Sequence, residues 1–365
     1  MCFLNAHGLI GGISRRRLSE TCGTLVNDDD VAVSVNDNAQ EAPEAPPAIP
    51  DGIKVWHDSP TATVDICFVH GLTGDWDSTW TSTPGSQPWP KQFLPSTFKN
   101  SRILTFGYGA YVAKKSTPST ARLMDHGANF LSDLVSNRLV NNATSRPIIL
   151  VAHSLGGLVC KEAILQSRDN PDHHLCDLFK SLRGVIFLGT PHRGSWISSW
   201  ARLPTRVPGI FKSANKLLLE SIGTKSENLA SLQIRFWTMM REQREAGRDL
   251  KVTCFYEEIG LPGVGVVVSR ESATLEGYKA LSIHGNHSTM VKFQSRDDNG
   301  YNRIVGELAQ MQWMSSSKSS TIILSESLCS TTSDSFTLPR QDARSSTSYS
   351  STSMASEGLA DTFSG

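Results

Sequence analysis

Residues 147–163 read Pro-Ile-Ile-Leu-Val-Ala-His-Ser-Leu-Gly-Gly-Leu-Val-Cys-Lys-Glu-Ala, and this stretch decides the fold. Its run at 148–151 is apolar and rich in β-branched residues, which is typical of a short strand buried on both faces. A helical spacing of apolar residues follows at once, with one side formed by Leu158, Val159, Ala163 and Ile164. The stretch therefore predicts a buried strand, a tight turn and a helix.

The turn itself reads Ala152-His153-Ser154-Leu155-Gly156, a nucleophile elbow with alanine in place of the first glycine. So tight a turn needs small residues on either side of the serine, and Ala152 and Gly156 meet that need. The turn lifts Ser154 Oγ clear of the backbone and places it at a helix N-terminus, where free N–H groups favour developing negative charge. Ser154 is the predicted nucleophile; the alternative is a serine that only caps the helix.

Length and charge narrow the class of protein. The chain has 365 residues, which allows one large α/β domain with tails or two domains. Lys and Arg number 35 in total, as do Asp and Glu, so the formal net charge is zero. This balance argues against a nucleic-acid partner and a polybasic membrane anchor. No apolar run approaches roughly 18 residues, so no membrane-spanning helix is expected.

Cysteine usage indicates the compartment. Seven cysteines are scattered, without a Cys-x-x-Cys pair or any metal-ligand spacing. Cys67, Cys160 and Cys254 fall in apolar segments, so we expect them in the core as thiols. An odd count without a disulfide framework favours a reducing compartment. We therefore expect no metal, no cofactor and an intracellular, cytoplasmic location.

Both ends of the chain are predicted to be disordered. Residues 1–50 include a linker with prolines at 43, 46, 47 and 50, and Ser and Thr dominate from 315 onward. An arginine run at 15–17 fits a transit peptide, so a mitochondrial or endoplasmic-reticulum membrane-associated location is the alternative. The predicted organisation is a disordered region at 1–50, one domain at 51–317 and a disordered tail at 318–365.

Strand and helix patterns alternate along the domain. We expect strands at 53–56, 62–69, 103–108, 148–151, 182–189, 250–256 and 280–283, and helices at 119–139, after the elbow and at 302–314. The segment 73–93 carries three tryptophans among polar and proline residues and is interpreted as a loop. The alternation predicts a mostly parallel, doubly wound sheet, with the strand carboxyl ends and the site at one edge.

The range 195–245 interrupts this alternation between two core strands. We expect a helical cap there, over the site. Five large apolar side chains would line an acyl pocket or make peripheral contact with a membrane, namely Trp196, Trp200, Leu203, Ile210 and Phe211. The alternative is that they pack the segment onto the core.

A serine nucleophile needs a base, usually histidine, and an acid that orients this base. In the chain order that accompanies the elbow, both follow the serine. The histidines at 173–174 lie in a polar loop and are expected to be solvated, and His192 comes too early. His284 and His287 both follow the last strand. We favour His287, because it lies in a loop, whereas His284 still belongs to the strand end.

The oxyanion of acyl transfer needs two backbone N–H groups. One is expected from Leu155, the residue after the nucleophile. The other is expected from the turn after the strand 62–69, where His70-Gly71-Leu72 matches the His-Gly start of such turns. We choose the Leu72 N–H; the alternative for this segment is an ordinary tight turn.

Taken together, several stretches resemble one family of α/β hydrolases, the serine-active-site-containing protein 1 type, related to the DUF676 and PGAP1-like lipase and esterase groups. The resemblance covers roughly residues 53–312. The matching stretches are Phe-Val-His-Gly-Leu at 68–72, Ala-His-Ser-Leu-Gly-Gly-Leu-Val at 152–159, Phe-Leu-Gly-Thr-Pro-His-Arg-Gly-Ser at 187–195, Val-Val-Val-Ser-Arg-Glu-Ser-Ala at 266–273 and Asn-His-Ser-Thr-Met at 286–290. Similar domains also begin fungal NACHT-type receptor-like proteins, but this chain has no P-loop motif. The resemblance implies the α/β-hydrolase fold and an ester or lipid-like substrate.

The acid is the open point of the site. No Asp stands just before Val266, where many lipases keep their acid, so the candidates are Glu257, Glu258 and Glu271. The first two end the strand 250–256 on the expected catalytic edge, on opposite sides of it. The spacing Phe255-Tyr256-Glu257 resembles that of the family, so we choose Glu257.

The sequence therefore predicts a serine esterase or lipase-like hydrolase. Ser154 is the nucleophile, His287 the base, Glu257 the acid, and Leu72 and Leu155 provide the oxyanion N–H groups. The alternative is a catalytically silent signalling or interaction module that keeps the α/β-hydrolase fold.

Overall fold

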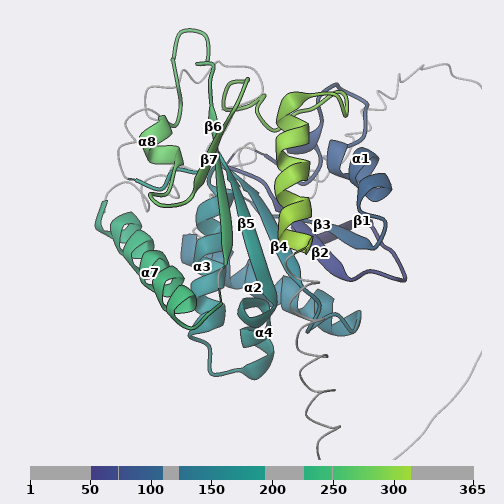
Figure 1. Cartoon of the computed structure of the whole chain (residues 1–365), viewed down its shortest axis with the longest axis vertical. Helices are drawn as coiled ribbons and strands as arrows, with labels where there is room; N and C mark the ends of the chain where they lie inside the picture. The colour runs from purple at the N-terminus through teal and green to yellow at the C-terminus, as the bar shows by residue number, and fades with distance from the viewer. Residues whose placement is uncertain (1–50, 73, 110–122, 194–225, 249, 314–365) are drawn as a thin grey trace, which may run out of the picture. The chain divides into compact units, whose positions relative to one another are not determined.

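The computed structural model describes residues 51–72, 74–109, 123–193, 226–248 and 250–313. Their strands form one sheet in the order β1-β3-β2-β4-β5-β6-β7 (Figure 1). The strand bounds are β1 Gly52–His57, β2 Val64–Val69, β3 Ser101–Gly107, β4 Ile148–His153, β5 Leu182–Leu188, β6 Lys251–Glu257 and β7 Lys279–Ile283. β1 is antiparallel to β3, and the other pairs are parallel. The predicted mostly parallel sheet is confirmed.

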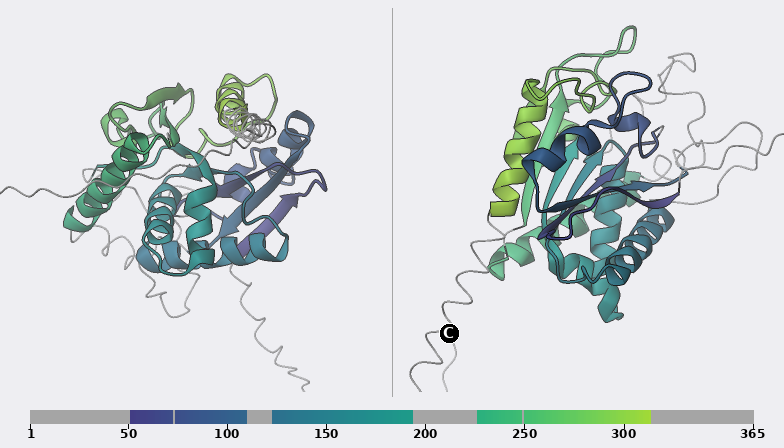
Figure 2. Two further views of the ribbon diagram at one scale, coloured as in Figure 1. Left: turned by 60° about the horizontal axis from the view of Figure 1, so that its bottom comes forward. Right: turned by 90° about the vertical axis from the view of Figure 1, so that its right-hand side faces the viewer.

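Helices cover both faces of this sheet (Figure 2). They are η1 Ser78–Trp80, α1 Trp89–Thr97, α2 Leu123–Val140, α3 Gly156–Arg168, α4 His173–Ser181, α7 Ser226–Glu245, α8 Arg270–Ala273 and a helix at 299–313. One face packs against α2, α3 and α7, and the other packs against α1 and the helix at 299–313.

Alternate residues of each central strand enter the two cores, because successive side chains of a strand point to opposite faces. Cys67, Leu150 and Val185 belong to the first core, whereas Ile66 and Ile149 belong to the second. Burial on both faces explains why these strands are continuous apolar runs in the sequence. It also fixes the register that brings the strand carboxyl ends to one edge.

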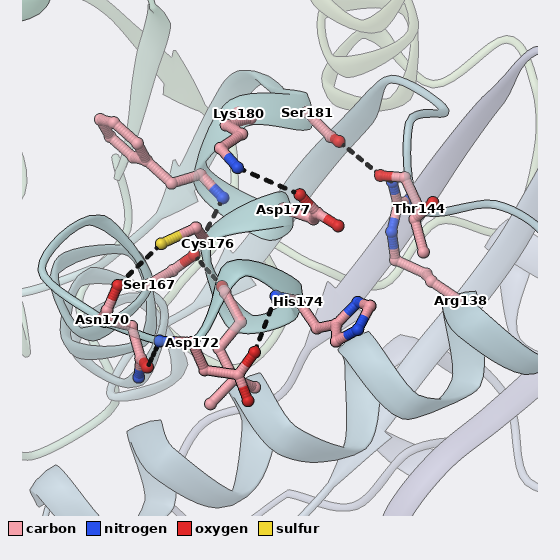
Figure 3. Close-up of polar contacts among 12 residues, drawn as sticks. Arg138, Thr144, Ser167, Asn170, Asp172, His174, Cys176, Asp177, Lys180 and Ser181 are labelled. Atoms are coloured by element: carbon pink, nitrogen blue, oxygen red, sulfur yellow. Dashed lines mark hydrogen bonds and ion pairs between the residues drawn. The ribbon is translucent and has the colours of Figure 1, made fainter.

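Two α-helices, α1 and α4, and the short 3-10 helix η1 lie where the sequence indicates loops. α1 begins inside the range 73–93, because a helix accepts proline in its first turn and Trp89 is buried in the second core. α4 begins at His173, and the Asp172 side chain caps it by accepting a hydrogen bond from the His174 N–H at 2.8 Å (Figure 3). The expected solvation of the two histidines is nevertheless confirmed, since both are exposed.

The predicted cap falls largely outside the described residues, and so do its five apolar side chains, Trp196, Trp200, Leu203, Ile210 and Phe211. The described part of the range is α7, which buries Leu229, Leu232 and Phe236 in the first core. This part is therefore a sheet-covering helix. The first residues of the helix expected at 119–139 also lie outside the described residues, and that helix is described from Leu123.

Candidate active site

The elbow has the geometry that its sequence predicts. β4 ends at His153, α3 begins at Gly156, and Ser154 between them has a φ of 54°. A non-glycine residue rarely adopts this left-handed conformation, which costs free energy and gathers at functional sites. The Ser154 N–H donates to the Leu188 carbonyl oxygen at 2.9 Å, which ties the turn to β5.

Gly156 is required by the same turn. A methyl group there would lie 2.3 Å from the carbonyl oxygen of His70 and 2.7 Å from that of Val69. Both are backbone atoms, which cannot rotate away as a side chain can. Because Gly156 has no side chain, α3 can start directly against the end of β2.

The base predicted from the sequence lies beside the predicted nucleophile. His287 comes from the His287 loop, residues 284–290, which follows β7. Its Nε2 lies 3.0 Å from Ser154 Oγ, within hydrogen-bond distance. The pair joins residues 133 positions apart in the chain. His284, the other candidate, is 83% exposed and has its Nδ1 3.0 Å from Glu258 Oε2.

Of the three acid candidates, Glu257 lies next to His287. Glu257 Oε2 is 3.6 Å from His287 Nδ1, and both side chains are buried. Catalytic hydrogen bonds are often this long before substrate binds. Glu257 Oε1 accepts from the N–H groups of Val267 and Val268 at 2.5 and 2.7 Å, which fixes the carboxyl group. Glu258 contacts His284, and Glu271 lies in the first turn of α8.

Burial sets the protonation of this pair. It holds the pKa of His287 well below its ordinary value, with the neighbouring His153 adding to the effect. Burial raises the pKa of Glu257 to about 7, opposed by backbone N–H groups that favour the carboxylate. Above that pH the site therefore holds a neutral imidazole, able to accept a proton, beside a carboxylate.

The Gly71 turn, residues 70–72, packs directly against the elbow. A methyl group on Gly71 would lie 2.8 Å from Ser154 Cβ. His70 Nε2 accepts from the Tyr108 N–H at 3.2 Å, so its proton is on Nδ1, which donates to the Gly71 carbonyl oxygen at 2.8 Å. In the trans peptide that follows, the Leu72 N–H points away from this carbonyl oxygen.

Two residues of this region, His70 and Gly189, have structural roles that were not predicted from the sequence. His70 fixes the Gly71 turn, and burial lowers its pKa to about 4, which keeps it neutral. Gly189, at φ 59°, lies under the His287 ring, where a methyl group would be 3.0 Å from Cε1. Gly189 belongs to the stretch 187–195 that resembles the family. A glycine directly after a buried strand is the sequence signal that could have indicated a left-handed conformation there.

For the whole chain, the sequence predicts neither a metal site nor a membrane-spanning helix. Within the residues that the structure describes, no group of three or more His, Cys, Asp and Glu side chains is arranged to hold a metal ion. In the same residues, none of the helices combines the length and apolar character needed to cross a bilayer. Cys67, Cys160 and Cys254 are buried free thiols, as expected.

Comparison with known proteins agrees with the geometry. Residues 66–235 match the family described as "Putative serine esterase (DUF676)". Protein SERAC1 of Danio rerio is 26% identical over 282 residues, which cover 69% of this chain and 40% of that protein. Protein SERAC1 of Mus musculus is 25% identical over 278 residues, with the same shares. The resemblance to the DUF676 and SERAC1 group is confirmed. The chain spans about 40% of the length of these relatives.

Two of the solved structures that are similar to this chain are named as esterases. A lipase-esterase related protein from Clostridium acetobutylicum is 12% identical, with a TM-score of 0.38, over 71% of this chain and 98% of that one. A thermophilic esterase from Thermogutta terrifontis is also 12% identical, with a TM-score of 0.39, over 72% and 93%. The strand order and the elbow after the central strand are those of an α/β hydrolase. The family match and this fold support a hydrolase.

Proposed function

We propose that this protein is a serine hydrolase that cleaves carboxylic esters through an acyl-enzyme. The observation that carries the proposal is the 3.0 Å distance between His287 Nε2 and Ser154 Oγ, on an elbow with the strained serine conformation. A serine hydroxyl is a weak nucleophile unless a positioned base takes its proton. A neutral, buried histidine at this distance meets that requirement.

The reaction would proceed in two halves. Ser154 Oγ attacks the ester carbonyl carbon while His287 Nε2 accepts its proton, and a tetrahedral intermediate forms. His287 then returns the proton to the leaving alcohol oxygen as the C–O bond breaks, leaving the acyl group on Ser154. Water then attacks the acyl carbon while His287 Nε2 accepts its proton. The bond from the acyl carbon to Ser154 Oγ breaks as His287 returns this proton to Oγ, and the carboxylic acid leaves.

Glu257 and the two leucine amides would support these steps. The Glu257 carboxylate holds the proton of His287 on Nδ1 and stabilises the imidazolium that forms. The N–H groups of Leu72 and Leu155 would bind the oxyanion. Leu155 is the N-cap residue of α3 and directly follows Ser154, and the Gly71 turn packs on Ser154, so both amides belong to segments in contact with the nucleophile.

A fluorophosphonate probe tests the proposal, because it reacts with an activated serine and mimics the tetrahedral state. The full chain should be labelled, and mass spectrometry should place the adduct on Ser154. Ser154→Ala should not be labelled. A folded wild-type chain without label would support the alternative of a catalytically silent interaction module.

The lipid-like character of the substrate is the finer part of the proposal, and it comes from the family resemblance. A series of p-nitrophenyl esters of increasing acyl length measures it. A kcat/KM that rises with acyl length would support a lipid-like ester. A maximum at the acetyl ester would leave an esterase for short acyl groups.

A further inference from the structure

His153, the last residue of β4, lies between the two other segments of the site. Its Nε2 is 2.9 Å from the backbone carbonyl oxygen of His287, and the two imidazole rings are 5.0 Å apart. On its other side, a methyl group on Gly71 would lie 3.3 Å from His153 Nδ1. One buried ring therefore lies close to the Gly71 turn and is hydrogen-bonded to the His287 loop, and it directly precedes the nucleophile in the chain.

The direction of the hydrogen bond follows from its acceptor. A carbonyl oxygen cannot donate, so the proton lies on His153 Nε2 and is directed at the His287 carbonyl oxygen. Burial lowers the pKa of His153 to about 4, so the ring is neutral at physiological pH. This hydrogen bond therefore joins two uncharged groups, and it runs from the end of β4 to the backbone of His287, the proposed base.

Several other hydrogen bonds of the His287 loop shape the loop itself or tie it to β6. Asn286 Oδ1 accepts from the N–H groups of Ser288 and Thr289, and Gly285 O accepts from the Ile259 N–H after β6. The bonds named here do not join the loop to β4. The hydrogen bond from His153 does join the loop to β4, next to the Ser154–His287 pair.

We propose that His153 is a positioning residue for the base, holding the His287 backbone so that Nε2 stays within reach of Ser154 Oγ. The proposal rests on the proposed serine hydrolase function. His153 does not touch the reacting atoms; it acts through the carbonyl oxygen of His287. Losing the donor would remove this hydrogen bond and let the loop move away from the elbow.

Three substitutions separate the donor from the ring. His153→Gln places an amide N–H at the same number of bonds from Cα as Nε2. His153→Met has a similar shape without a donor, and His153→Asn has an amide that is one methylene too short. Thr253→Val is the matched control, since it removes a buried hydrogen bond to Glu307 at the far end of β6.

The readout is saturation kinetics of fluorophosphonate labelling, with full-length chains and melting temperatures in parallel. For Met and Asn we expect kinact to fall roughly ten- to a hundredfold with KI unchanged, as for the removal of one partner of a buried hydrogen bond. Gln should stay within about threefold of wild type, because it restores the donor. Thr253→Val should be labelled at the wild-type rate. If slower labelling came only from a general loss of stability, this variant would be labelled more slowly as well.

The outcomes are distinct. Equal kinact for wild type, Met and Asn would overturn the proposal, and so would an equal loss in Gln and Asn, since the ring and not the donor would then matter. If Met does not fold, the comparison of Gln with Asn decides. If the wild type is not labelled, the proposed function fails, and hydrogen exchange at 284–290 still tests the tie: faster exchange in Asn but not in Gln supports it, and equal exchange overturns it.

Discussion

At the scale of single residues, the carboxyl group of Glu257 is the group whose chemical identity matters most. In Glu257→Gln, the amide oxygen can still accept from the Val267 and Val268 N–H groups, so the fold should persist. The amide nitrogen would then face His287 Nδ1 and favour the tautomer with its proton on Nε2, which cannot accept from Ser154. We expect kcat for a short ester to fall by about 10³–10⁴.

Glu258→Gln is the matched control, because Glu258 contacts the exposed His284 and not His287. It should keep kcat within about threefold of wild type, as expected for a surface pair. If both substitutions reduce kcat equally, or if only Glu258→Gln does, the acid is wrongly assigned although Ser154 and His287 keep their roles.

The same carboxyl group should give the reaction its pH dependence. In the proposed mechanism the active form has a neutral His287 and an ionised Glu257, and burial raises the pKa of this carboxyl group to about 7 while lowering that of the imidazole. Loss of a proton therefore activates the site, and kcat/KM should rise with pH and level off above a midpoint near 7. A profile that is flat from pH 5.5 to 8.5, or that falls over this range, would contradict this assignment of charge.

At the scale of elements, the close packing of the start of α3 against the end of β2 determines how near the elbow lies to the Gly71 turn. A methyl group at Gly156 would meet two backbone oxygens, so Gly156→Ala must move the elbow away from the Gly71 turn. We expect a lower melting temperature and slower labelling of Ser154. Gly306 is the control: it lies in the helix at 299–313, and a methyl group there meets no atom within 4 Å. Gly306→Ala should raise stability by up to about 1 kcal/mol and leave labelling unchanged.

A buried lysine joins α3 to two other elements. Lys161 Nζ lies 2.8 Å from Nδ1 of His192, after β5, and donates to Oε1 of Gln233, on α7, at 2.5 Å. Burial lowers the pKa of Lys161 to about 7, whereas an unfolded lysine keeps its proton up to about 10.5. Between these values the unfolded chain binds the extra proton, so this group makes stability rise with pH.

Lys161→Met should therefore remove part of the increase in unfolding free energy between pH 7.5 and 9, at most about 1.4 kcal/mol per pH unit. Urea unfolding of wild type and variant at several pH values measures the difference in slope. Lys180→Met, at an exposed lysine of α4, should leave the slope as in wild type. Parallel curves for wild type and Lys161→Met would show that Lys161 stays charged in the folded chain.

At the scale of the whole molecule, the sheet could be predicted because its central strands are buried on both faces and appear as apolar runs. α1 and α4 could not, since α1 is rich in proline and polar residues and α4 depends on the Asp172 cap. The choice between Glu257 and Glu258 depends on which side of β6 each faces relative to a loop from β7. The contact of His153 with His287 joins positions 134 apart and has no local signal.

The boundaries of the folded part remain a prediction from composition, and shortened chains test it. Residues 1–50 end in a proline-rich linker and residues 318–365 are dominated by Ser and Thr, so a fragment 51–317 should fold. It contains every strand and helix of the described structure, together with Ser154, His287 and Glu257. We expect its melting temperature and its labelling rate to equal those of the full chain.

The fragment 66–235 is the control, because it is the part that matches the DUF676 family. It ends before β6 and β7, so Phe187 on β5 loses its neighbour Cys254, and both Glu257 and His287 are absent. This fragment should neither unfold cooperatively nor be labelled. If instead 51–317 fails to fold while the full chain is labelled, residues outside 51–317 contribute to the domain and the predicted boundaries are wrong.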